Sequence, residues 1–259
     1  MSHVPVSSNV VALVTGGSRG IGKAVALRLA DQGLSVAINY RSSTAEADAI
    51  VQCIRDAGGR ALAVQADMSD ASQAADLVAR VESILGPLTV LINNAGITRD
   101  RLVIQMSSED WDATWTTDLA GTRALSRVAL ESMRRTGTGS IVNVSSVVGV
   151  IGNAGQANYA AAKSAVLGLT RDFAVRAACY NVRVNCVVPG YIVTDATAHL
   201  TEPQRRAWMT QIPMGRFATV DEVVGTIVFL AGAESSYLTG QCIAVDGGFL
   251  AAAGMGLES

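Results

Sequence analysis

A tyrosine and a lysine four residues apart are the first pair in this sequence that suits a chemical task. Three alanines separate Tyr159 from Lys163, and alanine is a strong helix former. Residues i and i+4 share one face of a helix, so the phenol and the ammonium should project into the same space. An ammonium near a phenol favours the phenolate. The pair is therefore a candidate for proton transfer, although two surface residues on an amphipathic helix would give the same spacing.

A glycine-rich segment has the composition of a phosphate-binding turn. Residues 15–24 read TGGSRGIGKA and lie between an apolar run and a helix-period segment. Such a turn brings backbone amides and a helix N-terminus against phosphate oxygens. The segment nearly matches the loop of nucleoside triphosphatases, but Ala24 stands where that loop needs a hydroxyl for Mg²⁺. Its glycine spacing also departs from GxGxxG, and a purely structural turn is the plain alternative.

The elements that must position these residues alternate along the chain. Short apolar runs rich in β-formers span 10–14, 35–38, 61–64, 89–92, 140–144, 182–187 and 242–245. Helix-period, alanine-rich segments span 21–31, 45–57, 69–85, 107–135, 159–178 and 220–231. This alternation predicts an α/β fold with a doubly wound, seven-stranded parallel sheet between two helical layers, a three-layer sandwich. Glycine and proline cluster after the strands, where such sheets bind ligands.

One segment breaks the alternation. Residues 191–217 hold polar residues, two prolines and a short helical piece. We expect them to form a lid over the carboxyl edge of the sheet. The chain has no linker rich in Pro, Gly or Ser and no second compositional regime, so residues 1–259 are predicted to form one domain.

Composition excludes several classes of partner. The chain has 259 residues, a net charge of −2 and a pI of about 5.7, so no broad basic surface is expected for nucleic acid or anionic lipid. The N-terminus lacks a signal-peptide layout and no apolar run approaches membrane-spanning length. Four scattered cysteines and two histidines form no metal-binding pattern. We expect reduced thiols, no metal, and a cytoplasmic location.

Four motifs in order carry a family resemblance. They are TGGSRGIG at 15–22, Asn93-Asn94-Ala95-Gly96, Ser146 and Tyr159-x3-Lys163. Together they resemble the classical short-chain dehydrogenase/reductase family from about Val10 to Phe249. SSVVGVIGNAGQANYAAAK, VNCVVPGYIVTDAT and YLTGQCIAVDGGF are similar to its 3-oxoacyl-[acyl-carrier-protein] reductase branch. The resemblance implies a Rossmann-like fold, a nicotinamide cofactor, and interconversion of carbonyl and alcohol by hydride transfer.

The resemblance also implies catalytic roles. Tyr159 would be the general acid that protonates the developing alkoxide, and Lys163 would lower its pKa from about 10. Ser146, thirteen residues before Tyr159, would polarise the substrate carbonyl, whereas Ser145 is interpreted as a strand-end residue. Relatives carry an asparagine where this chain has Asp118. We expect an altered proton relay there rather than a dead enzyme, with the carboxylate pairing with Lys163 and raising the tyrosine pKa.

The cofactor is expected to be NADPH. After the second apolar run the chain has Arg41 and no acid, and Arg19 lies in the glycine turn. Two guanidinium groups favour a 2′-phosphate, although solvated surface arginines are the alternative. The residues that the resemblance assigns to the cofactor are Gly16, Ser18, Arg19, Gly20, Ile21, Gly22, Asn39, Tyr40, Arg41, Asp67, Met68, Asn93, Ala95, Gly96, Tyr159, Lys163, Pro189, Gly190, Ile192 and Thr194.

The substrate implied by the branch is a 3-oxoacyl thioester on acyl carrier protein, of fatty acid or polyketide type. Arginines that meet the carrier in relatives are replaced here by Gly137-Thr138 and Cys179-Tyr180, so a CoA thioester or a small free ketone or secondary alcohol stays open. Gln156, with Trp208 and Met209 of the lid, should shape the pocket. The family also implies a homotetramer. A nucleotide-binding protein without turnover is the non-enzymatic alternative.

Overall fold

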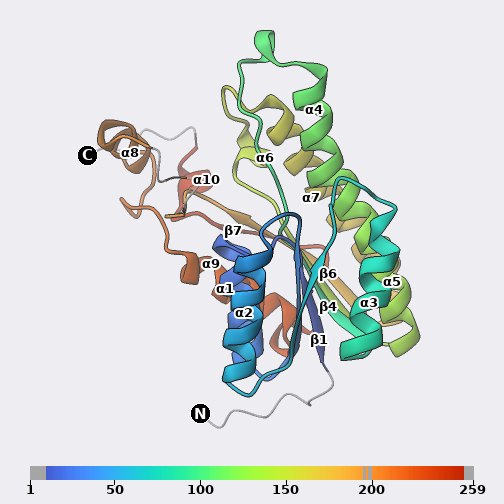
Figure 1. Ribbon diagram of the computed structural model, residues 1–259. Coiled ribbons are helices and arrows are strands. Elements are labelled where there is room, and N and C mark those ends of the chain that lie inside the picture. The colour runs from blue at the N-terminus through green and yellow to red at the C-terminus, as the bar shows by residue number, and fades with distance from the viewer. Residues whose placement is uncertain (1–9, 195–196, 198–199, 254–259) are drawn as a thin grey trace.

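A seven-stranded, entirely parallel sheet forms the centre of the molecule (Figure 1). The computed structural model describes residues 10–194, 197 and 200–253. The strands stand in the order β3-β2-β1-β4-β5-β6-β7. Their bounds are β1 Val11–Val14, β2 Ser35–Tyr40, β3 Ala61–Gln65, β4 Leu88–Asn93, β5 Gly139–Val144, β6 Val182–Pro189 and β7 Cys242–Val245. Every predicted strand is confirmed, and the central ones are buried along their length because helices cover both faces.

The longer helices form two layers, one on each face of the sheet (Figure 1). One layer holds α1 (Gly20–Asp31), α2 (Thr44–Asp56) and α9 (Val220–Ala231), whose apolar side chains share one core with the strands. The other holds α3 (Gln73–Leu85), α5 (Thr122–Thr136) and α7 (Ala157–Ala177), which share a second core. The predicted doubly wound three-layer sandwich is therefore confirmed.

The strand order reverses beside the first strand. From β1 the chain runs outward through β2 and β3, then crosses back to β4 on the other side of β1. In open α/β sheets, ligands bind at the carboxyl ends of the strands at such a switch point. The glycine-rich turn follows β1, and Asn93 ends β4. The topology therefore brings these two motifs together.

The predicted helix over 107–135 is wrong in one respect. It consists of α4 (Ser108–Trp115), a π-helical stretch η2 (Thr116–Gly121) and α5 in succession. A Cβ on Gly121 would overlap the carbonyl oxygen of Met68, so the helix approaches the segment after β3 closely at this point. Single π-helical turns are frequent at functional sites, and this one contains Asp118. Apolar periodicity does not report such a local change of helical pitch.

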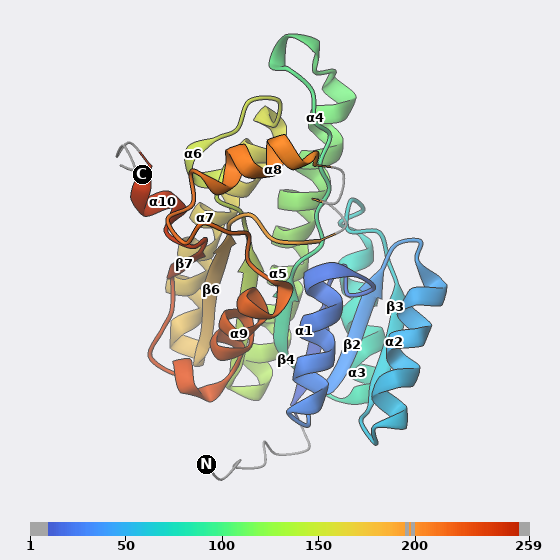
Figure 2. The same cartoon turned by 90° about the vertical axis from the view of Figure 1, so that its left-hand side faces the viewer.

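The remaining elements are short and lie mostly near the carboxyl edge of the sheet. They are η1 (Val103–Gln105), α6 (Val148–Ile151), η3 (Ala178–Tyr180), α8 (Glu202–Met209), η5 (Ala233–Ser235) and α10 (Phe249–Ala252). Figure 2 shows α8 beyond the ends of the strands, beside α6 and α10. None of the helices among the described residues has the length and apolar character that a membrane span requires.

An aromatic cluster fixes the segment that carries α8. The ring of Tyr191 lies 4.6 Å from that of Trp208 and 5.4 Å from those of Phe217 and Phe249, measured between centroids. Aromatic pairs at such distances are favourable beyond the area they bury. The described part of segment 191–217 is therefore held to α10 by its own side chains. Residues 195–196 and 198–199 of this segment lie outside the described residues.

Replacing Gly121 by alanine tests the close approach of η2 to the segment after β3. Because the added Cβ would overlap the carbonyl of Met68, the backbone must shift, and we expect the free energy of unfolding to fall by about 1–3 kcal/mol. Urea denaturation measures it. The matched control is Gly168→Ala within α7, where an added Cβ meets no heavy atom within 4 Å; it should be neutral or stabilise by up to about 1 kcal/mol. Equal stability of Gly121→Ala and the wild type would contradict this packing.

Candidate active site

Ser146, Tyr159 and Lys163 meet at the carboxyl edge of the sheet, as the sequence predicts. Ser146 follows β5, and the other two lie in the first turns of α7. The hydroxyl of Ser146 lies close enough to the phenol to lower its pKa, and the Lys163 ammonium lies 5.5 Å from the centroid of the tyrosine ring. Ser146 and Tyr159 are partly exposed, whereas Lys163 is buried. A substrate can therefore reach a hydroxyl and a phenol, with the ammonium behind them.

The start of α7 is held in place by buried polar contacts. The side-chain amide of Asn158 donates to the carbonyls of Arg99 and Asp110 and to the hydroxyl of Thr114, each at 3.1 Å. Its oxygen accepts a hydrogen bond from the backbone NH of Tyr159 at 2.8 Å. These bonds tie the tyrosine to α4 and to the loop that precedes it. The sequence analysis missed Asn158.

A second anchor holds the lysine. The hydroxyl of Ser145 donates to the backbone carbonyl of Lys163 at 2.7 Å and is buried. Ser145 therefore does more than end β5, as the sequence analysis had it, because it fixes α7 against the sheet. The nearby Gly149 allows this approach, since a Cβ there would lie 2.7 Å from the carbonyl carbon of Lys163.

Lys163 forms a buried ion pair with Asp118. Their Nζ and Oδ2 atoms are 3.1 Å apart, and the side chains are 5% and 0% exposed. The ammonium also donates to the carbonyl of Val144 at 3.2 Å. The other carboxylate oxygen, Oδ1, accepts from the backbone NH of Ile97 at 2.8 Å. The predicted pairing of Asp118 with Lys163 is confirmed. The backbone carbonyl of Asp118 accepts from the hydroxyl of Thr122 at 2.8 Å.

The surroundings raise the pKa of Tyr159. Burial is the largest cause; Lys163 and the hydroxyl of Ser146 lower this pKa, while Asp118 and Asp100 raise it. The prediction that Lys163 lowers the phenol pKa therefore has the right sign, but burial and two carboxylates outweigh the ammonium, so the net pKa is raised. The predicted effect of Asp118 has the right sign. For Lys163, burial alone would lower the pKa, but Asp118 and Tyr159 outweigh it and the pKa is raised.

The glycine turn is locked to the end of β4. The side chain of Asn94 donates to the carbonyls of Thr15 and Gly16 at 3.0 and 3.2 Å. The hydroxyl of Thr15 accepts from the backbone NH groups of Asn94 and Ala95, both at 3.0 Å. Gly16 has a φ of +60°, a conformation that favours glycine, and a Cβ on Gly22 would overlap the carbonyl oxygen of Gly16. The sequence analysis missed Thr15 and Asn94.

This turn fits the phosphates of a dinucleotide. Helix α1 has no side-chain cap at its N-terminus and no acidic residue in its first turn, so its first backbone NH groups are free to bind an anion. Arg19 and Gly20 beside it are exposed. These are the donors and the partial positive charge that a pyrophosphate needs.

At the end of β2, two of the predicted cofactor residues are buried and one is exposed. The amide of Asn39 donates to the carbonyl of Ala66 at 2.9 Å, its oxygen accepts from the NH of Gly16 at 3.4 Å, and its side chain is buried. Asn39 therefore supports the glycine turn through hydrogen bonds within the protein. Tyr40 is also buried, whereas Arg41 is exposed. In the described part of the chain, neither Arg19 nor Arg41 forms an ion pair.

The other predicted cofactor residues lie along the same edge, several of them in contacts within the protein. Asp67 accepts from the backbone NH and the hydroxyl of Ser69. The amide of Asn93 donates to Ser126 and Asn143, so its side chain braces the strands. The remaining positions end β6 or follow β1, β4 or β6, and are Ser18, Ile21, Gly96, Pro189, Gly190, Ile192 and Thr194.

Gln156, predicted to contact substrate, is held at both ends. Its amide donates to the two carboxylate oxygens of Asp100 at 3.1 and 3.0 Å, and its oxygen accepts from the amide of Asn153 at 2.9 Å. The backbone NH of Arg101 also donates to the carbonyl of Gly155 at 2.8 Å. The loop after β4 and the loop before α7 are thus joined at the mouth of the site.

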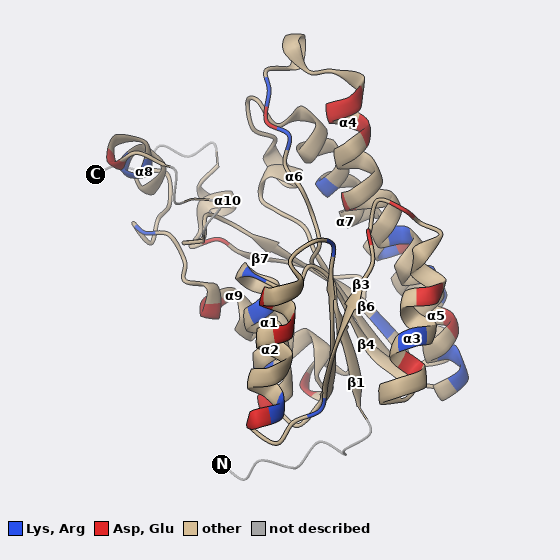
Figure 3. Cartoon of the chain, viewed as in Figure 1, with Lys and Arg blue, Asp and Glu red and all other residues tan. Residues whose placement is uncertain are grey.

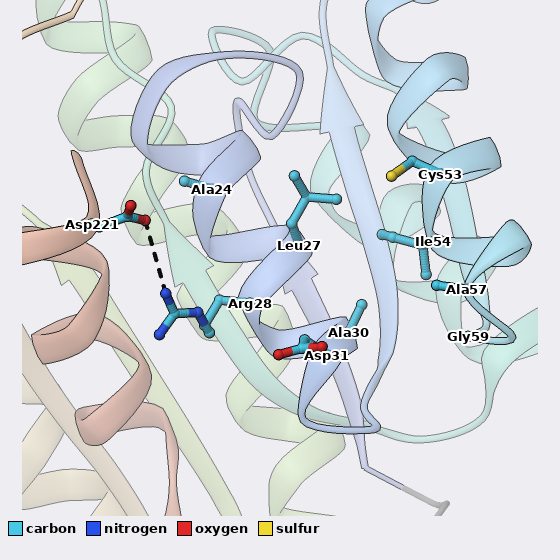
Figure 4. A pocket seen from close by; sticks show the side chains of 10 residues that line it. All are labelled: Ala24, Leu27, Arg28, Ala30, Asp31, Cys53, Ile54, Ala57, Gly59 and Asp221. Atoms are coloured by element: carbon cyan, nitrogen blue, oxygen red, sulfur yellow. Dashed lines mark ion pairs between the residues drawn. The ribbon is translucent and has the colours of Figure 1, made fainter.

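A hollow of about 500 Å³ lies elsewhere, between α1 and α2. Figure 4 shows Leu27 and Ile54 facing each other across it, with the ion pair of Arg28 and Asp221 (3.9 Å) on one side. None of the predicted catalytic or cofactor residues lines it. The chemistry is therefore expected at the sheet edge and not in this hollow.

Known proteins resemble the chain over nearly its whole length. The sequence model of a family described as enoyl-(acyl carrier protein) reductase matches residues 16–250. The 3-oxoacyl-[acyl-carrier-protein] reductases of Staphylococcus aureus and Thermotoga maritima are 44% and 43% identical, over 92% and 93% of this chain and 96% and 97% of theirs. That of Synechocystis is 45% identical over 93% and 96%. A crystal structure provisionally described as a short-chain alcohol dehydrogenase of Sinorhizobium meliloti has a TM-score of 0.90 and 35% identity, with 93% and 96% covered.

Replacing Asn94 by alanine tests its part in fixing the glycine turn. The variant leaves the carbonyls of Thr15 and Gly16 without two hydrogen bonds, so we expect the free energy of unfolding to fall by about 1–3 kcal/mol. Chemical denaturation measures it. Gln52→Ala removes an exposed hydrogen bond to Asp56 on α2 and should stay within about 0.5 kcal/mol of the wild type. Indistinguishable curves for the two variants would show that Asn94 is not the anchor.

Proposed function

The chain belongs to the short-chain dehydrogenase/reductase family, and from this we propose that it uses NADPH to reduce a 3-oxoacyl thioester, carried on acyl carrier protein, to the 3-hydroxyacyl product. The observation that carries the proposal is the meeting of Ser146, Tyr159 and Lys163 beside a phosphate-binding turn. Relatives named for this reaction match over 92% of the chain or more. The names of these relatives are more specific than the description of the broad family, which names reduction of a carbon–carbon double bond.

The residues suit reduction of a ketone in the following way. A nicotinamide cofactor held at the glycine turn would supply the hydride for the reduction. The hydroxyl of Ser146 and the phenol of Tyr159 donate hydrogen bonds to the carbonyl oxygen, where negative charge develops. Tyr159 then transfers its proton to that oxygen. Its raised pKa keeps the phenol protonated at neutral pH, as an acid requires. The rate should therefore fall only as the pH rises through this raised pKa.

Positive charge without a competing acid supports NADPH over NADH. Arg19 and Arg41 are exposed near the glycine turn and the end of β2. An acid at the end of β2 would bind the ribose hydroxyls of NAD, and Tyr40-Arg41 stand there instead. A guanidinium can bind a 2′-phosphate in bidentate fashion.

The carrier is the less supported half of the proposal. Positive and negative residues are interspersed over the helices (Figure 3). Among the arginines on α5, α7 and α8, Arg134, Arg135, Arg176 and Arg206 each form an ion pair with a glutamate or aspartate. Arg205 instead lies 5.3 Å above the ring of Phe217. These pairings reduce the positive charge available to an acidic carrier and favour a second candidate function, reduction of free ketones. A CoA thioester, which is itself anionic, is the other substrate that the test below compares.

Further features are proposed with this function. Segment 191–217 would act as the substrate lid of a single domain spanning 1–259. A homotetramer assembled through the helical segment 107–135, which holds α4 and α5, and through α7 is proposed from the family; two exposed tryptophans on α4, Trp111 and Trp115, support it, at 37% and 39% exposed. A cytoplasmic location is consistent with the cysteines, which are free thiols.

Tyr159→Phe tests the acid. Without the phenolic proton we expect kcat/KM to fall by about 10²–10⁴-fold, while NADPH still binds. NADPH absorbance is followed with acetoacetyl groups on carrier protein, on CoA and on N-acetylcysteamine. Tyr180→Phe, an exposed tyrosine in η3, is the control and should match the wild type. Preference for the carrier protein supports the proposed substrate, indifference supports the second candidate, and full activity of Tyr159→Phe would refute the assigned role.

Arg41→Ala tests cofactor choice. Loss of a charge-assisted contact worth about 1.5–3 kcal/mol should raise the KM for NADPH by about 10–100-fold and leave that for NADH unchanged. Arg60→Ala is the control, because its exposed guanidinium donates only to the carbonyl of Ile84, before β3 and away from the site. An equal loss with both cofactors would mean that Arg41 does not recognise the 2′-phosphate.

A further inference from the structure

The carboxylate of Asp118 bears on the protonation of Tyr159. We propose that Asp118 is a positioning residue which, by holding the ammonium of Lys163 in a buried ion pair, keeps the phenol of Tyr159 in its proton-donating form at higher pH. The inference rests on the proposed function in that it takes Tyr159 as the acid. Position 118 carries a negative charge in this chain, and an asparagine there would have nearly the same shape without the charge.

The geometry leaves the carboxylate one partner that can balance its charge. Asp118 is 0% exposed, and Oδ1 receives the hydrogen bond of the Ile97 backbone. Oδ2 accepts no hydrogen bond and lies 3.1 Å from the ammonium of Lys163. A carboxylate buried without compensation is strongly unfavourable, whereas the ammonium also donates to the carbonyl of Val144. The lysine and the aspartate are therefore expected to stay charged together, as a pair with no net charge.

Pairing of Lys163 with Asp118 changes the electrostatic potential at the phenol of Tyr159. The ammonium lies 5.5 Å from the tyrosine ring, and an unpaired positive charge at that distance would favour phenolate. With the carboxylate of Asp118 3.1 Å from the ammonium, the positive charge is offset by a neighbouring negative one. The phenol then keeps its proton to a higher pH than it would beside a lone lysine.

The other groups that face this pair act in the same direction or weakly. Asp100, on the loop after β4, adds a second negative charge near the phenol, but it is exposed and bound by Gln156, so solvent screens it. The thiol of Cys186, on β6, faces Lys163, and its raised pKa keeps it neutral. The hydroxyl of Ser146 carries no charge. Of the two carboxylates that raise the phenol pKa, Asp118 is thus the buried one and has the larger effect.

Both directions of the reaction depend on the same phenol. Reduction needs the protonated form as donor, so its rate falls as the pH rises through the phenol pKa. Oxidation of the alcohol needs the phenolate as acceptor, so its rate rises over the same range. Asp118 cannot change the overall equilibrium, which belongs to the reactants. It sets the pH at which both changes occur.

Asp118→Asn is the decisive variant. We expect the alkaline fall of kcat/KM for reduction of acetoacetyl-N-acetylcysteamine, and the rise for oxidation of its 3-hydroxybutyryl counterpart, to move together to lower pH by about one pH unit. Above both transitions, reduction by the variant should be about tenfold slower relative to its own maximum than reduction by the wild type. Asp112→Asn, an exposed aspartate in α4, is the matched control and should leave both profiles in place.

A titration without substrate separates this inference from the proposed function. The ultraviolet absorbance of phenolate is followed against pH in wild type and Asp118→Asn, each with and without Tyr159→Phe, so that the difference isolates Tyr159. A lower transition in the Asn variant supports the inference even if no thioester is turned over. An unchanged or higher transition overturns it, whatever the activity. If Asp118→Asn does not fold, Asp118→Ser removes the same charge and carries the same expectation.

Discussion

The ion pair between Asp118 and Lys163 is the interaction on which the site depends. Removing two charges from water costs on the order of several kcal/mol per ion, so the pair persists only where the fold holds both partners. Four elements do so: η2 supplies the aspartate, α7 the lysine, the end of β5 a carbonyl, and the loop after β4 a backbone NH. The glycine at position 96 leaves room, because a Cβ there would lie 2.9 Å from Asp118 Oδ2 and 3.1 Å from Lys163 Nζ.

The same constraint explains the irregular helix between β4 and β5. A regular α-helix through 116–121 would present a different register of side chains to the sheet edge. The π-helical turn places Asp118 inward against Lys163, while Gly121 lets the backbone approach Met68. The polar anchors at Ser145 and Asn158 hold α7 to the end of β5 and to α4. The ion pair, the π-helical pitch and the close approach of Gly121 to Met68 therefore depend on one another.

Sequence alone predicted the sheet and its two helical layers, because buried parallel strands are short apolar runs and helices repeat every 3.6 residues. It also identified Ser146, Tyr159 and Lys163, whose order and spacing are distinctive. It missed Thr15, Asn94 and Asn158, since a polar residue that satisfies buried backbone groups shows no periodicity. The net pKa of Tyr159 could not be predicted from the sequence either, because burial and the positions of Asp118 and Asp100 near the phenol are properties of the folded chain.

The aromatic cluster around Tyr191 connects two distant parts of the chain. Phe249 in α10 meets Tyr191, which in turn meets Trp208 in α8 and Phe217. Movement of α8 away from the sheet would therefore have to break contacts with the C-terminal helix as well. As a result, α8 and the last described helix of the chain are mechanically linked, so a substitution that loosens α10 would loosen α8 as well.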